Sequence, residues 1–190
     1  MKFIGFNVQT GYLTMTTELA TWLADEAIVK ANMASGPGEG IASRDQIAGL
    51  TGLEMMQSLL NGKLPSVPIA NTLDFCLIHL DDGKTIFQGT PKSAHLNPLG
   101  TIHGGWISTL LDSALGCAVH TKMPVGRGYT TAELSVNMVR ALTPKVERVR
   151  AIAEVLHCGR QLATAHAKLV GPDGTLYAHA TTTCLVFEMK

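Results

Sequence analysis

The pattern of hydrophobic and polar positions predicts one long helix in the middle of the chain. Between Trp106 and Val119 the only polar side chains are those of Ser108, Thr109, Asp112 and Ser113. A helix that is apolar around nearly its whole circumference must be enclosed by the rest of the protein. The turn sequence NPLG lies shortly before this run, so we expect a buried central helix that begins at His103 or Gly104.

Shorter runs on either side of this helix have the period of β-strands. The turn sequence DDG separates two apolar runs and predicts a hairpin of strands over residues 74–80 and 85–89. In the first strand after the helix, alternation places Thr131 and Glu133 on one face. We therefore expect an α+β fold with a curved antiparallel sheet wrapped around the central helix. After the helix, four strands are predicted over residues 129–139, 149–156, 161–170 and 176–187.

The first 42 residues are expected to form an extension, helical or partly disordered, before a single domain over residues 43–190. Within the extension, residues 17–34 predict a helix. The capping-box pattern Ser43-x-x-Gln46 then predicts a second helix over residues 44–61. The apolar side of the first helix is expected to carry Leu19, Leu23, Ala27 and Ile28.

Composition narrows the class of protein. With 15 basic and 15 acidic residues among 190, the formal net charge is zero and no basic run occurs, so no nucleic-acid partner is expected. The four cysteines and the histidines lack metal-ligand spacing, so we expect reduced thiols and no metal. No apolar segment reaches the roughly 18–20 residues that span a bilayer. A cytoplasmic location without membrane attachment is therefore expected.

An acidic side chain in the apolar helix is the main candidate for chemistry. An ionised carboxylate is costly in such a setting unless it is paired, hydrogen-bonded or used in a reaction. Asp112 therefore has two interpretations. Either its carboxylate reaches solvent at the edge of the buried surface or caps a neighbouring loop, or it is a reactive group. The Gly104-Gly105 pair at the helix start offers N–H groups at the positive end of the helix dipole, which suits a carbonyl oxygen or an oxyanion. Together these features indicate acyl chemistry.

The stretch HLNPLGTIHGGWISTLLDSALG resembles the signature of the hotdog-fold acyl-CoA thioesterases, in the phenylacetate-pathway thioesterase-like (PaaI-like) branch. The resemblance extends more weakly from about Leu73 to Phe187. It implies the hotdog fold and hydrolysis of acyl-CoA thioesters without a cofactor. It also implies a homodimer or a dimer of dimers with active sites at the subunit interface.

The same resemblance implies roles for individual residues. Gly104 supplies a backbone N–H to the thioester oxygen, and Asn97 binds the substrate or the attacking water. Asp112 acts as general base or nucleophile. Thr131 matches a hydroxyl position that assists from the start of the third strand.

Other residues near this motif are candidates for supporting roles. His103 is expected to be neutral and structural, or a hydrogen-bond anchor for the turn, because a helix N-terminus disfavours a cation. Gly105 is a candidate for contact with coenzyme A. Arg160 resembles the basic position that follows a glycine in the family's turn, and is expected to contact coenzyme A phosphates. Glu133 is a second-tier candidate because it is predicted to share a face with Thr131.

Helix geometry predicts that the site is shared between two chains. Gly104 and Asp112 are eight residues apart, which separates them by roughly 12 Å along one helix. An acid–base group must lie within about 3 Å, or one water, of the reacting atoms. The carboxylate must then come from a second copy, which a two-fold axis between antiparallel helices would supply.

Two other functions stay open from the sequence alone. A non-catalytic acyl-CoA binding module would bind its ligand without turnover, but it has no need of a buried carboxylate. A hotdog hydratase or dehydratase would require His95 within reach of Asp112.

Met55 and Met56 of the predicted 44–61 helix also have two interpretations. They either pack against the sheet, which we favour, or border an acyl pocket.

Overall fold

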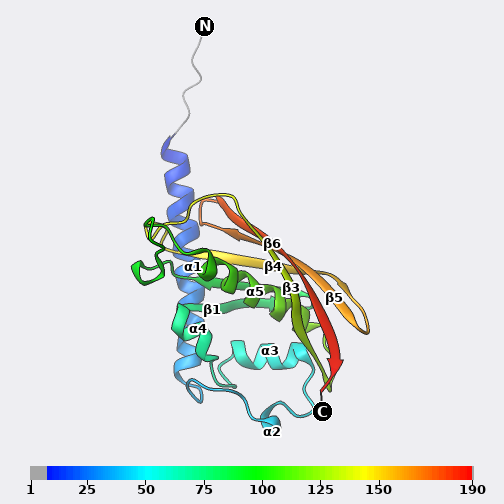
Figure 1. The fold of residues 1–190 in the computed structure, drawn as a ribbon. Helices are drawn as coiled ribbons and strands as arrows, with labels where there is room; N and C mark the ends of the chain where they lie inside the picture. Colours follow the sequence, from blue (N-terminus) through cyan, green and yellow to red (C-terminus); the bar gives the residue numbers. More distant parts are fainter. Residues whose placement is uncertain (1–7, 190) are drawn as a thin grey trace.

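The computed structural model describes residues 8–189, with side chains from residue 17 onward. A six-stranded sheet curls around one long helix, α5 (Figure 1). The expected α+β hotdog architecture is confirmed. The elements are α1 (Val8–Ala34), α2 (Arg44–Ile47), α3 (Gly52–Leu60), α4 (Pro68–Leu73), β1 (Phe75–Asp81), β2 (Lys84–Gly89), the short helix η1 (Ser93–His95), α5 (Gly104–Thr121), β3 (Arg127–Met138), β4 (Val149–Cys158), β5 (Leu162–Val170) and β6 (Leu176–Glu188).

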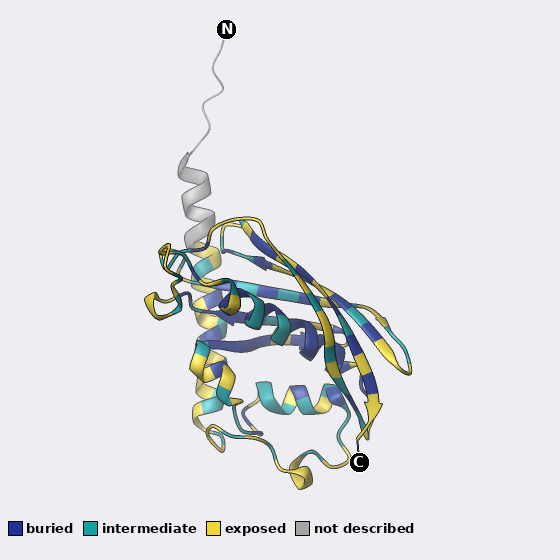
Figure 2. Cartoon of the chain, viewed as in Figure 1, coloured by how far each residue is buried: buried dark blue, intermediate teal, exposed yellow. Residues whose placement is uncertain are grey.

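The sheet has the order β1-β2-β4-β5-β6-β3, and every neighbouring pair is antiparallel. Its concave face packs on α5, where Leu110, Leu111 and Leu115 are fully buried. The facing positions on β4, β5 and β6 are mostly alanines, whose small side chains let the sheet approach the large helix residues closely. Buried positions accordingly occupy much of α5 and alternate with less buried positions along β5 and β6 (Figure 2). Strands β1 and β3 form the two open edges.

The helix predicted over residues 44–61 is wrong, because the structure contains two helices there. The capping box of Ser43 and Gln46 is present but starts only the single turn of α2. Gly49 then has a φ of 77°, and Thr51 starts α3 with a second capping box. Gly52 explains the close docking of α3 on the end of α5, because a Cβ there would lie 1.8 Å from the carbonyl oxygen of His120. The short helix α4 was not predicted.

A β-bulge in β3 changes the face on which one candidate lies. Thr131 pairs with Cys184, and Glu133 pairs with the adjacent Thr183, so the register shifts between them. Neighbouring residues of a strand point to opposite faces, and Thr131 and Glu133 therefore do so as well. Thr131 faces α5, whereas the exposed Glu133 points away from it. The prediction that they share a face is wrong.

Helix α1 packs on the outer face of the sheet, opposite α5. Phe75 belongs to the main core, whereas the next residue, Cys76, packs with Val29 of α1 on the other face. The face predicted for this helix is wrong. Leu23 and Ile28 are 37% and 64% exposed, and the buried residues are Trp22, Glu26 and Val29. The prediction from apolar periodicity failed because a charged residue, Glu26, occupies the centre of the buried side.

A buried polar network holds α1 on the sheet. Glu26 accepts hydrogen bonds from Gln88 Nε2 at 2.8 Å and from Arg148 Nε at 2.5 Å, and it also pairs with Lys30. Next to it, Arg150 lies over the Trp22 ring at 4.5 Å. Burial opposes ionisation of Glu26, but the hydrogen bonds from Arg148, Lys30 and Gln88 outweigh it and hold its pKa below the ordinary value.

Replacing Glu26 with glutamine removes the buried negative charge that pairs with Arg148 and Lys30. We expect Glu26→Gln to lower the free energy of unfolding at pH 7 by about 3–5 kcal/mol, measured by chemical denaturation. The depressed pKa stabilises the fold at pH values above the unfolded-state pKa, and this contribution is lost as the pH falls through the folded pKa. Wild type and variant should therefore converge in acid.

A matched control is Glu154→Gln, because Glu154 also forms an ion pair, with Lys84, but its side chain is 51% exposed. Here we expect a loss below about 1 kcal/mol. A Glu26→Gln effect no larger than that of Glu154→Gln would contradict the importance assigned to the buried network.

Candidate active site

The loop before α5 is built around the side chain of Asn97. Its Oδ1 accepts the N–H groups of Leu99 at 2.9 Å and Thr101 at 3.2 Å, and its Nδ2 donates to Thr101 Oγ1 at 2.8 Å. Gly100, with a φ of 79°, completes the turn. Within one chain, Asn97 therefore organises the loop, and one Nδ2 hydrogen is left over for a ligand.

His103 caps α5 and determines which backbone groups stay available. Its Nδ1 accepts the Gly105 N–H at 2.8 Å, so this nitrogen carries no proton in this arrangement. That contact agrees with the anchoring role expected for His103. It also occupies the Gly105 N–H, so the predicted pair of free N–H groups is reduced to one. Among the described residues, none accepts the N–H of Gly104.

Gly104 and Asn97 line the same small cleft, with a volume of ≈ 260 Å³. Met138 forms part of its wall, and a Cβ on Gly104 would lie 2.7 Å from Met138 Cε, so the cleft has little room for a side chain there. Arg140 also lines the cleft and is exposed. The sequence favoured Arg160 over Arg140 for phosphate contact, because the nearness of Arg140 to Gly104 depends on where β3 ends.

Asp112 lies further along α5 and is held by β3. Thr131 Oγ1 donates to Asp112 Oδ1 at 3.1 Å, which joins two of the predicted residues. Asp112 is half-buried, and so are its neighbours on one side of α5, whereas most other positions of the helix are buried. This uncovered stripe of α5 consists of Gly105, Ser108, Thr109, Asp112, Ser113, Cys117 and His120.

Tyr129 lies one helical turn from the Asp112 position and was not predicted from the sequence. Its hydroxyl packs so closely on α5 that a Cβ on Gly116 would lie 2.6 Å from it. Burial raises the pKa of Tyr129, so the phenol stays neutral beside the carboxylate of Asp112. Gly116 within an apolar helix was the available signal, since a glycine there indicates the close approach of another group.

The two halves of the candidate site are far apart in one chain. Gly104 lies near Met138 at one end of β3, whereas Arg127 at the other end donates a hydrogen bond to the carbonyl of Arg160. The twelve residues of β3 span roughly 36 Å. Arg160 is thus remote from the Gly104 of its own chain, and Asp112 is roughly 12 Å from it along the helix axis.

His95 is engaged near the start of α5. Its ring stacks on Trp106 with the centroids 5.2 Å apart, and its Nδ1 faces the Lys92 N–H at 3.2 Å. Burial and the positive charge of Lys92 lower its pKa. Trp106 is six residues before Asp112, roughly 9 Å along the helix. This placement does not favour a dehydratase pair within one chain.

The described residues contain neither a membrane-spanning helix nor a cluster of metal ligands. Between residues 8 and 189, no helix is both long and apolar enough to cross a membrane. In the same part of the chain, no three histidine, cysteine, aspartate or glutamate side chains come together in a way that could hold a metal ion.

Comparison with known proteins identifies the family. The thioesterase superfamily model matches residues 99–178, the span that contains Gly104, Asp112 and Thr131. A solved thioesterase family protein from Silicibacter pomeroyi is 30% identical with a TM-score of 0.59, and the match covers 64% of this chain and 90% of that one. The chain belongs to the thioesterase superfamily. Membership makes it an enzyme that hydrolyses thioesters.

Two further solved thioesterase-fold structures agree with the PaaI-like resemblance. A phenylacetic acid degradation-related protein from Ralstonia eutropha is 27% identical with a TM-score of 0.63, covering 68% of this chain and 97% of that one. A variant of the phenylacetic acid degradation protein PaaI from Thermus thermophilus is 29% identical with a TM-score of 0.56, covering 62% and 97%. Among curated proteins, none matches this thioesterase chain.

The hydrogen bonds of Asn97 generate a test that separates loop support from substrate contact. We expect Asn97→Ala to lower the free energy of unfolding by about 1–3 kcal/mol, because two backbone N–H groups lose their acceptor. It should also raise KM more than it lowers kcat. Leu99→Ala is the control, since Leu99 is in the same loop and 90% exposed. Unchanged stability with a large loss of kcat would instead indicate direct action of Asn97 on the reacting atoms.

Proposed function

We propose that this thioesterase hydrolyses acyl-CoA thioesters at a site built from two copies of the chain. The observation that carries the proposal is the separation of two groups on α5. The N–H of Gly104 is available at the helix start, and the carboxylate held by Thr131 is eight residues further along. Neither group alone can both polarise a thioester and activate water, and their distance prevents joint action within one chain.

The open edge at β3 supports a two-fold arrangement. Within the described chain its outer side is unpaired, and all of its residues from 130 to 138 are exposed or half-buried. Along β3, Asp112 lies beside Thr131 and Gly104 lies beside Met138. An axis halfway between them, close to Ser135, would place the Asp112 of one chain beside the Gly104 of the other. The uncovered stripe of α5 would then be covered by its counterpart.

The proposed reaction uses one group from each chain. The thioester oxygen accepts the hydrogen bond of the Gly104 N–H, at the positive end of the α5 dipole. The partner subunit's Asp112 takes a proton from a water molecule, whose oxygen bonds to the carbonyl carbon. The tetrahedral intermediate then expels the coenzyme A thiolate, which receives the proton, and the acyl group leaves as the acid.

Coenzyme A carries phosphates, and basic side chains are available on both chains. Arg140 lines the Gly104 cleft directly. Arg160, at the far end of β3 in its own chain, would approach this cleft from the partner subunit if the strands pair antiparallel. We propose that these arginines contact the phosphates. Gly105 contributes shape rather than its N–H, which His103 already occupies.

One variant distinguishes the proposed hydrolysis from a second candidate function, which is acyl-CoA binding without turnover. Asp112→Asn keeps the volume and a hydrogen-bonding side chain but cannot accept the proton of water. We expect kcat to fall by about a hundredfold or more with the fold intact, measured by thiol release from a panel of aryl- and medium-chain acyl-CoA substrates. Absence of thiol release from every member of the panel by the wild type would contradict the proposed acyl-CoA activity.

Mixing two inactive variants tests the shared site. One chain carries Asp112→Asn, and the other carries Gly104→Leu, whose side chain would fill the cleft against Met138. In a mixed dimer, one site has both defects and the other has neither. After subunit exchange we expect activity to return, to about half the wild-type value per mixed dimer.

The control is the same mixture kept under conditions without subunit exchange, which should stay inactive. Lack of recovery in a preparation where exchange is demonstrated, for example by mass spectrometry, would mean that each site forms within one chain.

A further inference from the structure

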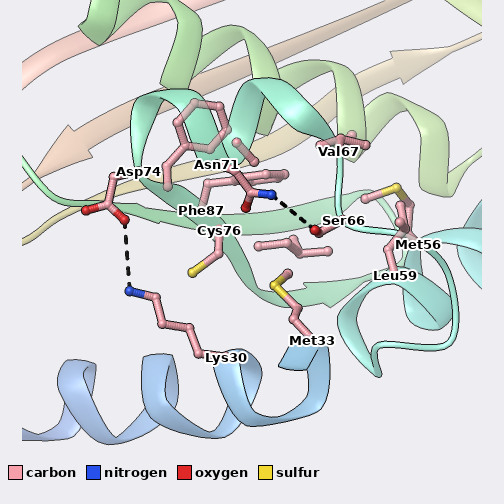
Figure 3. Close-up of a pocket in the computed structure, with 14 residues that line it drawn as sticks. Lys30, Met33, Met56, Leu59, Ser66, Val67, Asn71, Asp74, Cys76 and Phe87 are labelled. Atoms are coloured by element: carbon pink, nitrogen blue, oxygen red, sulfur yellow. Dashed lines mark hydrogen bonds and ion pairs between the residues drawn. The ribbon is translucent and has the colours of Figure 1, made fainter. Parts of the chain in front are cut away.

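A cavity of ≈ 310 Å³ lies at the open edge of β1, away from the Gly104 cleft. Helix α1 borders it on one side, and α3 and α4 border it on the other (Figure 3). Its volume is about twice that of the ~150 Å³ apolar cavity that holds a benzene molecule. Its wall is formed by residues from α1, α3, α4, β1, β2 and α5.

The lining of this cavity is apolar and its polar groups are already paired. Met33, Met56 and Leu59 point into the space, as Figure 3 shows. At its rim, Lys30 faces Asp74 at 3.9 Å and also pairs with Glu26. Asn71 donates to Ser66 and to Glu39 there. No charged ligand group would find an unpaired partner among these side chains, so the cavity suits an uncharged apolar group.

Cys117 connects the cavity to the uncovered stripe of α5. Its thiol is enclosed deeply enough for burial to raise the pKa to about 12, yet the residue is not fully buried. It also lines the cavity. Asp112 is five residues earlier in the uncovered stripe, roughly 7.5 Å along the helix axis and about 140° around it. The proposed catalytic carboxylate and the cavity therefore lie at opposite margins of this stripe.

We propose that this cavity receives the acyl group of the substrate, and that it selects uncharged acyl chains of medium length. This inference rests on the proposed acyl-CoA hydrolysis. The thioester carbonyl lies at the Gly104 of one chain, and the acyl chain runs past the partner subunit's Asp112 into the cavity of that partner. Very short acyl groups end before they reach Cys117 and gain nothing from the apolar wall.

The N-terminal helix is a specificity element in this arrangement. Met33 of α1 closes the side of the cavity opposite α3, and the buried Glu26 network keeps α1 in place. Met56 of α3 thus borders an acyl pocket as well as packing in the core, which joins the two interpretations of the methionine-rich helix. The matches to the similar solved structures cover about two thirds of this chain. About one third of the chain is therefore additional to what these structures share with it.

The test uses two thioethers that cannot be hydrolysed, S-octyl-coenzyme A and S-methyl-coenzyme A. We expect the wild type to bind the octyl compound at least tenfold more tightly, measured by calorimetry. Met33→Trp and Leu59→Trp should each reduce that preference at least tenfold, because the indole fills the cavity. Both positions are partly exposed, so a larger side chain is compatible with folding. Leu23→Trp is the matched control on the outer side of α1.

Hydrolysis provides an independent readout. The ratio of kcat/KM for octanoyl-CoA to that for acetyl-CoA should fall in the same two variants and not in Leu23→Trp. Binding preference and ratio unchanged in both variants, with hydrolysis intact, would overturn the cavity assignment alone. A third outcome is that both variants lose the octyl preference while the wild type hydrolyses no acyl-CoA. This outcome would support the cavity as an alkyl-binding site and contradict the proposed function.

Discussion

The enclosure of α5 is the constraint on which the rest of the structure depends. A helix that is apolar on nearly every side cannot be left in water, and a single curved sheet can surround only part of it. The alanine-rich strands bring the sheet close to Leu110 and Leu115, and α3 covers the end of the helix. What stays uncovered is a stripe that carries Asp112. The part of α5 that the sheet does not cover therefore includes Asp112, the carboxylate of the proposed site.

Much of this arrangement is predictable from the sequence because its signals are local. The apolar run of α5, the DDG hairpin and the alternating strands give the element order, and the order allows few sheet topologies. The start of α5 next to His103 was also predicted from the sequence. Thr131 was assigned to the site only through the family resemblance, and its hydrogen bond to Asp112 comes from the structure.

The failures come from features that a period cannot encode. A bulge of one residue in β3 moved Glu133 to the far face, and Gly49 divided one expected helix into two. The buried side of α1 was missed because Glu26 is its central residue, and a buried glutamate is acceptable only when partners such as Arg148 and Gln88 are known. These partners are more than sixty residues away in sequence. The cavity at β1 could not be predicted for the same reason.

The position of α1 also limits how pairs of subunits can be stacked. With Trp22 and Val29 packed against β1 and β2, that part of the outer sheet surface is occupied by the chain itself. A dimer of dimers that stacks sheet against sheet would have to use the other part, where Leu162 and Leu185 are paired across β5 and β6 and remain exposed. In such an assembly, the N-terminal helix would hold the covered parts of the two sheets apart.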